Sequence, residues 1–440
     1  MSSRVGSFVR AGTRPSLGGR STMWKQHATP LRTLFNARPP PNRFLSGVRS
    51  TVIVVGLGLG AYYLSDSRAA AYRYFFVPVL RWTTDAETAH ELAIKALKAG
   101  ITPVDRSRDV VDPALEAEVF GQTLLSPVGL AAGFDKNGEA IDSLFDLGFS
   151  YVEVGSITPK PQVGNPKPRF FRLPKDDAAI NRYGFNSDGH LKVATRLRLR
   201  LHAFLSSNPE SWPVNHAFRA GRMLGVNLGK NKTGNEIEDY IEGVQTMGNY
   251  ADVLIINISS PNTPGLRDMQ SEAKLGGLLS AVIKARDGLS TPQKPPICVK
   301  IAPDLTELEV VAIAEIVKKS GIDGVIVSNT TITRPASLKS PKALSSEVGG
   351  LSGPPVKEPA LHTLRTLRRA IGPDFTLIGC GGISSGKDAI EFAKAGASFV
   401  QALTAFAYDG PGFPSKLREE IKTELAGRKW KDLVNADYPS

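Results

Sequence analysis

The stretch "DVLIINISSPNTPGLR", residues 252–267, changes character halfway along its length. Its first half is an apolar run rich in β-branched residues, which is typical of a buried strand. Its second half crowds short polar side chains and two prolines into one loop. A plain turn needs fewer polar groups. The stretch therefore predicts a core strand that is followed by a loop with a chemical role.

Seven other runs of this kind occur along the chain. The eight predicted strands lie at 126–133, 150–156, 222–229, 252–258, 296–302, 323–329, 375–382 and 398–405. Helical periodicity follows most of them, at 236–247, 275–286, 306–319, 360–371, 387–395 and 416–425. Strands that alternate with helices indicate a parallel sheet, and eight strands close a (β/α)8 TIM barrel. A doubly wound sheet is the alternative fold.

Nearly every predicted strand ends in polar or glycine-rich sequence. Active sites of such barrels lie at these carboxyl ends, so the pattern predicts a reaction site there. Four of the ends carry a lysine, namely Lys136, Lys160, Lys230 and Lys300. Two connections, 159–190 and 331–355, are long, and long loops in compact domains usually cover or bind a ligand.

The seventh predicted strand runs into "IGCGGISSG", residues 378–386, and then into a helix. Backbone N–H groups at glycines and at a helix N-terminus form a phosphate cradle. The position after the seventh strand favours this interpretation over an ordinary glycine-rich turn. None of the six histidines has metal-ligand spacing to a cysteine or a second histidine, so we expect no metal. Cys298 and Cys380 lie within apolar runs and are predicted to be small core residues.

The positive charge is concentrated at the N-terminus. The formal net charge is +12, but residues 1–50 hold nine Lys or Arg and no acidic residue, which leaves +3 for the rest. A basic, Ser-rich and Arg-rich N-terminus resembles a mitochondrial transit peptide. A solvated tail is the alternative, and without a base-stacking module we expect no nucleic acid as partner.

An uncharged stretch follows, "STVIVVGLGLGAYYLS" at 50–65. As a helix it covers about 24 Å, less than the roughly 30 Å hydrocarbon core. If the helix starts at Phe44, it is long enough to cross the hydrocarbon core, provided that the Arg49 side chain extends toward the headgroups. We predict a single-pass membrane anchor. The predicted divisions are 1–49 for targeting, 50–65 for the anchor, 66–100 for a helical hairpin and 101–440 for the barrel.

The predicted hairpin has two amphipathic helices. Tyr72, Phe75, Phe76 and Val79 share one helical face, and Pro78 is expected to kink or end that helix. "TDAE" at 84–87 predicts a capping box that opens a helix to Gly100. The pair either lies on the bilayer surface or packs as an ordinary hairpin on the main domain.

The loop sequences resemble those of one family, the dihydroorotate dehydrogenases. The resemblance rests on "LAAGFDKNGE" (130–139), "VEVGSITPKPQVGNPKPR" (152–169), "INRYGFNSDG" (180–189), "GVNLGKNK" (225–232), "NISSPNTPGLR" (257–267), "VKIAPD" (299–304), "SNTT" (328–331), "GGLSG" (349–353) and "GCGGISSG" (379–386). It covers residues 84–410, in family order. More narrowly, the chain is similar to the class 2 members, which are mitochondrial and reduce quinones. The resemblance implies an FMN-containing barrel that oxidises dihydroorotate to orotate in pyrimidine synthesis.

The resemblance also implies roles for individual residues. Ser260 would be the general base, where soluble class 1 members have Cys, with Thr263 as its proton route, Phe185 as a shield and Lys300 to stabilise charge on the reduced flavin. The implied substrate contacts are Lys136, Asn181, Arg182, Tyr183, Gly184, Phe185, Asn257, Asn262, Asn329 and Thr330. The implied FMN contacts are Ala132, Gly133, Lys136, Ser156, Asn227, Asn257, Lys300, Ser328, Gly353, Gly381, Gly382, Leu403 and Thr404.

Ubiquinone and the lipid of the inner mitochondrial membrane are the further partners that the resemblance implies. His90 and Arg172 match quinone-tunnel positions, and Arg81 stands where other members carry Gln. Leu403 replaces a Tyr that animal members often have, so a hydroxyl facing the quinone site would be lost. If the hairpin serves only the quinone, removing residues 1–100 should leave oxidation of dihydroorotate intact. The competing hypotheses are a soluble-type enzyme using fumarate or NAD and an inactive membrane-tethered binding protein.

Overall fold

The computed structural model describes residues 43–210, 215–291 and 293–438. The chain forms two units, Met1–Gly58 and Leu59–Ser440. The described part of the first unit belongs to helix α1 (Arg43–Leu64), which begins seven residues before the predicted anchor. Its segment Ser46–Leu64 has a mean hydropathy of 1.4 and is long and apolar enough to cross a bilayer. Most of the predicted targeting segment, residues 1–42, lies outside the described residues.

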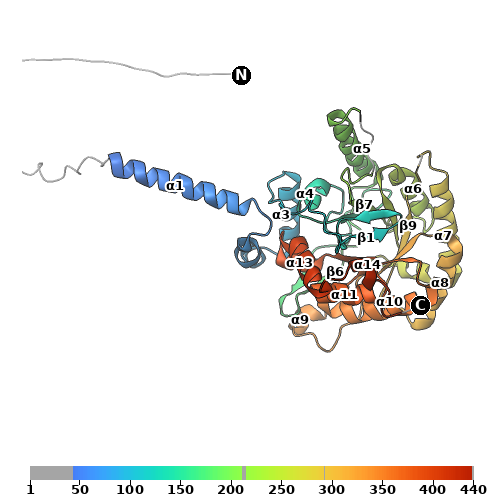
Figure 1. Ribbon diagram of the computed structural model, residues 1–440. Helices are drawn as coiled ribbons and strands as arrows, with labels where there is room; N and C mark the ends of the chain where they lie inside the picture. Colours follow the sequence, from blue (N-terminus) through green and yellow to red (C-terminus); the bar gives the residue numbers. More distant parts are fainter. Residues whose placement is uncertain (1–42, 211–214, 292, 439–440) are drawn as a thin grey trace, which may run out of the picture. The chain divides into compact units, whose positions relative to one another are not determined.

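The second unit contains a closed barrel of eight parallel strands, with the helices outside it (Figure 1). The strands are β3 (Val128–Leu130), β4 (Tyr151–Ile157), β7 (Met223–Leu228), β8 (Val253–Asn257), β9 (Ile297–Ile301), β10 (Gly324–Val327), β12 (Thr376–Cys380) and β13 (Phe399–Ala402). β13 pairs with β3 and closes the barrel, with Gln401 opposite Gly129. The predicted TIM barrel is therefore confirmed, and the doubly wound alternative is wrong.

The strands are buried on both faces, which is why they read as nearly continuous apolar runs. The surrounding helices are α4 (Ile141–Asp146), α5 (His190–Ser207), α6 (Glu238–Met247), α7 (Glu272–Asp287), α8 (Glu307–Ser320), α10 (Lys357–Ile371), α11 (Gly386–Lys394), α12 (Thr404–Asp409), α13 (Phe413–Leu425) and α14 (Trp430–Leu433). Each of the six predicted helices is present and begins within one turn of its expected start. Cys298 and Cys380 are buried and free, as predicted.

The two long connections fold together over one end of the barrel. The first contains β5 (Phe170–Leu173) and β6 (Ala178–Asn181), and the second contains α9 (Lys342–Ser345) and β11 (Gly350–Ser352). These strands form one antiparallel sheet in the order β11-β6-β5. Gly350 is opposite Asn181, so segments about 170 residues apart meet beside the strand ends. A separate hairpin, β1 (Ala117–Val119) and β2 (Gln122–Leu124), precedes the barrel.

The hairpin helices are η1 (Tyr72–Phe76), α2 (Val77–Thr83) and α3 (Ala86–Lys98). Of the two expected effects of Pro78, a kink or an end, the end is not found. Pro78 lies in the first turn of α2, directly after a π-helical turn in which the Val77 N–H bonds the Tyr72 carbonyl, and this irregular turn precedes it without a break in the helix. Proline is tolerated there because its missing N–H would have few partners. The predicted capping box is also wrong. Asp85, not Thr84, caps α3 by accepting the N–H groups of residues 87 and 88.

Candidate active site

A cavity of about 930 Å³ lies between the carboxyl ends of the barrel strands and the hairpin helices. It contains both a polar region, with amide and hydroxyl side chains from the βα loops, and an apolar region bounded by η1, α2, α3 and α12. The predicted site residues that line it are Arg81, His90, Ala132, Gly133, Lys136, Ser156, Arg172, Asn181, Tyr183, Gly184, Phe185, Asn257, Ser260, Asn262, Lys300, Ser328, Asn329, Thr330, Gly353, Gly381, Gly382, Leu403 and Thr404. Three predicted residues, Arg182, Asn227 and Thr263, lie outside its lining.

Each of these three has its own environment. Arg182 faces away from the cavity and donates to Glu347 at 2.6 Å. Asn227 lies behind the wall, where its Nδ2 donates to the fully buried Glu153 at 2.7 Å. Thr263 is buried, and its hydroxyl has no hydrogen-bond partner among the described residues.

A network of amides lines the polar end. Asn257 Nδ2 donates to Ser156 Oγ at 2.8 Å and to Asn227 Oδ1 at 3.2 Å. Asn329 Nδ2 donates to Asn257 Oδ1 at 3.2 Å. Glu153 accepts hydrogen bonds from the amide nitrogens of both Asn227 and Gln401. The Asn227 side chain therefore points its oxygen toward Asn257, whose amide nitrogen donates to it. The result is a flat wall of fixed donors and acceptors that suits a planar, amide-rich ligand.

The loop after β8 brings Ser260 to this wall. Ser260 is 7% exposed, and its Oγ accepts the backbone N–H of Asn262 at 3.3 Å. Asn262 Nδ2 in turn donates to Asn181 Oδ1 at 3.3 Å, which joins the loop to β6. Pro261 also lies beneath the covering sheet, 3.2 Å from the place where a side chain on Gly350 would begin. The prolines and short polar residues of this loop thus hold the hydroxyl of Ser260 at the cavity.

Two of the four strand-end lysines reach the cavity. Lys136 lies with its Nζ 3.8 Å from the centre of the Tyr183 ring, and burial lowers its pKa to about 7. Lys300 projects from β9 and is 4% exposed. Lys160 is exposed, and Lys230 bonds carbonyl groups of its own loop. All four lysines follow predicted strands, so only the folded structure distinguishes Lys136 and Lys300, which reach the cavity, from Lys160 and Lys230, which do not.

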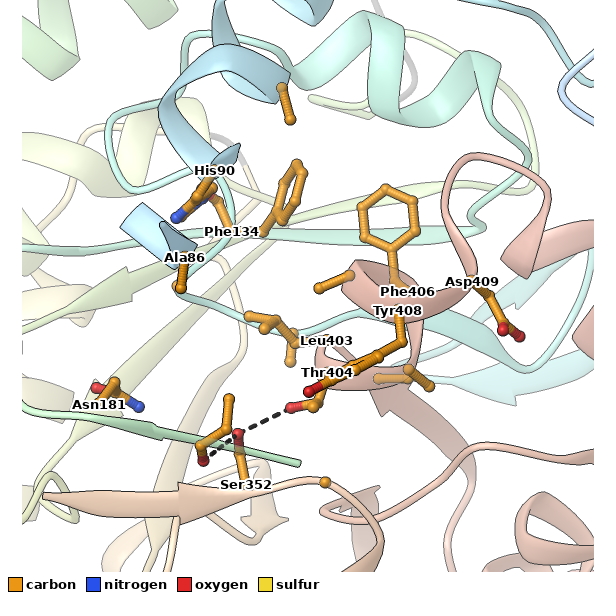
Figure 2. A pocket seen from close by; sticks show the side chains of 18 of the residues that line it. Ala86, His90, Phe134, Asn181, Ser352, Leu403, Thr404, Phe406, Tyr408 and Asp409 are labelled. Carbon is orange, nitrogen blue, oxygen red and sulfur yellow. Dashed lines mark hydrogen bonds between the residues drawn. The ribbon is translucent and has the colours of Figure 1, made fainter. Parts of the chain in front are cut away.

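The glycine-rich segment differs from the predicted cradle in one respect. The backbone N–H groups at the start of α11 are already occupied, since Asp388 accepts those of Ser384 and Ser385 and Glu420 accepts that of Gly386. The predicted cradle could therefore use only the preceding glycines and their neighbours in space, not the N-terminus of α11. Gly382 has φ +77° and approaches residue 357 so closely that a Cβ would lie 2.6 Å from a backbone nitrogen. Thr404 donates to Ser352 Oγ at 2.9 Å on the same side of the cavity (Figure 2).

His90 and Phe134 stand together at the other end of the cavity (Figure 2). His90 Nε2 bonds the Phe134 carbonyl at 2.6 Å, and burial lowers the pKa of His90 to about 3, so the ring is neutral and donates this bond. Arg172 donates to the carbonyls of Arg81 and Thr84 and so ties the end of α2 to β5.

A tyrosine hydroxyl is present in this wall despite Leu403. The guanidinium of Arg81 lies 5.0 Å from the ring centre of Tyr408, whose OH donates to the Ala178 carbonyl at 2.9 Å. Sequence reasoning missed Tyr408, although it follows Leu403 by about one helical turn and a half. The pair Glu87–Arg169, described below, was also missed because "TDAE" matched a capping pattern.

The profile of the dihydroorotate dehydrogenase family matches residues 114–425, which contain every barrel strand. The chain belongs to this family. A mitochondrial dihydroorotate dehydrogenase (quinone) from Schizosaccharomyces pombe is 50% identical over 397 residues, 86% of this chain and 89% of the relative. The corresponding protein of Mus musculus is 44% identical, with 87% of this chain and 93% of the relative covered. A crystal structure of ligand-free type DHODH from Eimeria tenella superposes with a TM-score of 0.75 at 40% identity, over 81% of this chain and all of that one.

Membership of the dihydroorotate dehydrogenase family is consistent with the polar end of the cavity, since the amide and hydroxyl groups there suit a heterocyclic ring that carries amide groups. Among the described residues, no group of three or more His, Cys, Asp or Glu could hold a metal ion.

Proposed function

We propose that this chain oxidises (S)-dihydroorotate to orotate with FMN as hydride acceptor and ubiquinone as final electron acceptor, at the inner mitochondrial membrane. The chain is a quinone-dependent dihydroorotate dehydrogenase of pyrimidine biosynthesis. The observation that carries the proposal is the single cavity, in which a polar wall and an apolar channel are continuous. One end suits the substrate, the other suits a quinone tail, and the flavin belongs between them.

The residues present fit FMN. Gly382 and Gly353 hold positive φ angles, and a Cβ at either would meet backbone atoms of the protein within 2.8 Å, so both turns require glycine. With no side chain at these positions, a phosphate could approach the backbone. Thr330, an implied substrate contact beside the flavin positions, has a buried hydroxyl without a partner among the described residues, as expected for a group that awaits a ligand. FMN held by Gly353, Gly382 and Thr404 would supply an acceptor for the hydride from C6 of the substrate and a donor of electrons to the quinone. Lys300 supplies positive charge beside it.

The chain's own residues would handle the substrate and its C5 proton. Asn257, Asn329 and Asn181 orient the ring, and Lys136 attracts the carboxylate of dihydroorotate. Ser260 Oγ takes the C5 proton. A serine hydroxyl is a poor base at neutral pH, so it must pass on its own proton. The buried, unpartnered hydroxyl of Thr263 suits a water-bridged route for that proton.

The apolar end of the cavity would admit the quinone. Its walls include Phe76, Leu80, Ala93, Leu97 and Phe406. On the helices η1 and α2, which bound this end, Trp82, Tyr74 and Phe75 are 88%, 73% and 59% exposed. Exposed aromatic residues beside an apolar channel suit the surface of a bilayer. With the part of α1 after residue 49 as the anchor and residues 1–49, which include its first turns, as the targeting segment, these features support a single-pass protein whose domains divide near residues 49, 65 and 100.

The visible absorption spectrum of the purified protein tests the proposal. We expect oxidised-flavin bands that bleach when dihydroorotate is added without oxygen and that recover on addition of a ubiquinone analogue. A colourless protein, or a spectrum that dihydroorotate leaves unchanged, would contradict the proposed function. Bleaching without recovery by quinone would contradict only the proposed acceptor.

A further inference from the structure

A buried ion pair joins the helical hairpin to the loop before β5. Glu87, in the first turn of α3, and Arg169 each have only 9% of their side chain exposed. Arg169 donates from Nε at 3.1 Å and from Nη2 at 2.8 Å to Glu87 Oε1. Burial acts to raise the pKa of Glu87, but the hydrogen bonds and charges of Arg169 and of the more exposed Lys167, 3.3 Å away, outweigh it, so the pKa is lowered. The buried Arg169 therefore depends on the charge of Glu87 to remain buried.

Arg169 continues this contact into the substrate site. Its Nη1 donates to the carbonyls of Val163 at 2.5 Å and Asn165 at 2.9 Å. Asn165 Nδ2 in turn donates to the carbonyls of Arg182 at 2.9 Å and Asn262 at 3.3 Å. The backbone N–H of Asn262 bonds Ser260 Oγ. A continuous path of hydrogen bonds thus runs from α3 to the loop that carries the proposed base.

A second contact runs through Tyr183. The Arg169 guanidinium lies 5.1 Å from the centre of the Tyr183 ring, and Lys136 Nζ lies 3.8 Å from it. Burial lowers the pKa of Lys136, and the negative charge of Glu87 opposes that change while Arg169 adds to it. The negative charge of Glu87 on α3 therefore affects the pKa of Lys136 in the proposed substrate pocket.

We propose that Glu87 is a positioning residue for substrate oxidation: through Arg169 it holds the Ser260 loop and keeps Lys136 charged in the dihydroorotate pocket. Neither Glu87 nor Arg169 lines the cavity, so neither is a catalytic residue. The inference rests on the proposed function. It also changes the expectation that residues 1–100 can be removed without harm to the first half-reaction, because that deletion would leave Arg169 buried without a counter-charge.

The charge of Lys136 gives the proposal a measurable signature. The titratable and charged groups that act on it are Glu87, His90 and Glu91 of α3, Asp135 of its own loop, Arg169 and Tyr183. Replacing Glu87 by Gln leaves Arg169 to repel Lys136, so the pKa of Lys136 falls further. The carboxylate of orotate needs a protonated Lys136. We therefore expect orotate binding to weaken at a lower pH in the variant than in the natural enzyme.

The test compares Glu87→Gln with Glu91→Gln in the full-length, FMN-loaded enzyme. Glu91 lies one turn further along the same helix, is half exposed and contacts Lys167 but not Arg169. Its negative charge also raises the pKa of Lys136, but less than that of Glu87, so Glu91→Gln removes a smaller charge effect while leaving Arg169 paired. Orotate affinity is measured from the change in flavin absorbance across a pH series, and flavin reduction and quinone reoxidation are timed separately. For Glu87→Gln we expect about five- to tenfold weaker orotate binding at neutral pH, a pH midpoint shifted downward and slower reduction, with reoxidation unchanged.

Equal orotate affinity, pH midpoint and reduction rate in the two variants would overturn the proposal. If Glu87→Gln does not fold, the double variant Glu87→Gln, Arg169→Gln leaves no unpaired buried charge. It is still expected to bind orotate more weakly, because Gln cannot replace the guanidinium bonds to the carbonyls of residues 163 and 165. Normal affinity in the double variant would equally refute the proposal. Failure of the natural enzyme to be reduced by dihydroorotate would instead refute the proposed function.

Discussion

Replacing Gly382 by Ala tests the phosphate end of the flavin site. The glycine has φ +77°, a conformation that costs an L-residue about 1–2 kcal/mol. The added Cβ would also lie 2.6 Å from the nitrogen, 2.8 Å from the Cα and 2.7 Å from the Cβ of Lys357. Backbone atoms at the start of α10 cannot move aside as a flexible side chain can. The glycine turn must therefore shift away from its present position.

Such a shift should displace the backbone N–H groups that face the phosphate. Loss of one or two charge-assisted hydrogen bonds, each about 1.5–3 kcal/mol, corresponds to at least a tenfold loss of FMN affinity. FMN content after gel filtration and the rise in unfolding temperature on adding FMN both report this loss. We expect the variant to be folded, paler than the natural protein and partly restored by excess FMN.

Gly372→Ala is the matched control for Gly382→Ala. Gly372 also has a positive φ, +98°, but no atom lies within 4 Å of the place its Cβ would occupy. That variant suffers backbone strain without the clash and should keep its full FMN content. If both variants hold equal amounts of FMN, the phosphate lies on another loop.

Three further predictions follow from the remaining parts of the structure. Ser260→Ala should retain FMN and orotate binding but slow stopped-flow flavin reduction by about 10²–10⁴-fold, and near-normal reduction would remove Ser260 from the mechanism. Deleting residues 1–64 removes α1 but keeps Asp66, which pairs with Val104. The shortened protein should float less with liposomes while still reducing quinone in detergent. Undiminished flotation would refute α1 as the anchor. His90 is buried with its pKa lowered from 6.5 to about 3, so the unfolded state binds a proton first as the pH falls. Its neutral burial should cost roughly 1.4 kcal/mol of folding stability per pH unit below 6.5, and a denaturant series with His90→Gln as reference would show no such difference if the assignment is wrong.

The eight strands and their polar loops could be predicted from the sequence, and the number of strands favoured a closed barrel over a doubly wound sheet. Parallel strands covered on both sides must be continuously apolar, and the loops at one end must carry the chemistry. The apolar strand and the polar loop after it are both local features, so they can be recognised in a single stretch such as 252–267. The resemblance of these loops to one family followed from the same local residues. The cap of α3 was misjudged because Thr84 and Asp85 are adjacent and both can cap a helix.

Only the tertiary structure decided which polar residues act together. Lys136 and Lys300 enter the cavity whereas Lys160 and Lys230 do not, although all four follow strands. Glu420 closes the N-terminus of α11 from a helix more than thirty residues away. Glu87 pairs with Arg169, which lies 82 residues away in the sequence. Hydrophobic periodicity repeats every few residues, so it can be recognised within a short stretch of sequence. A buried charge, by contrast, is paired with whichever group the fold brings within about 3 Å. The spacing of two residues in the sequence does not give that distance.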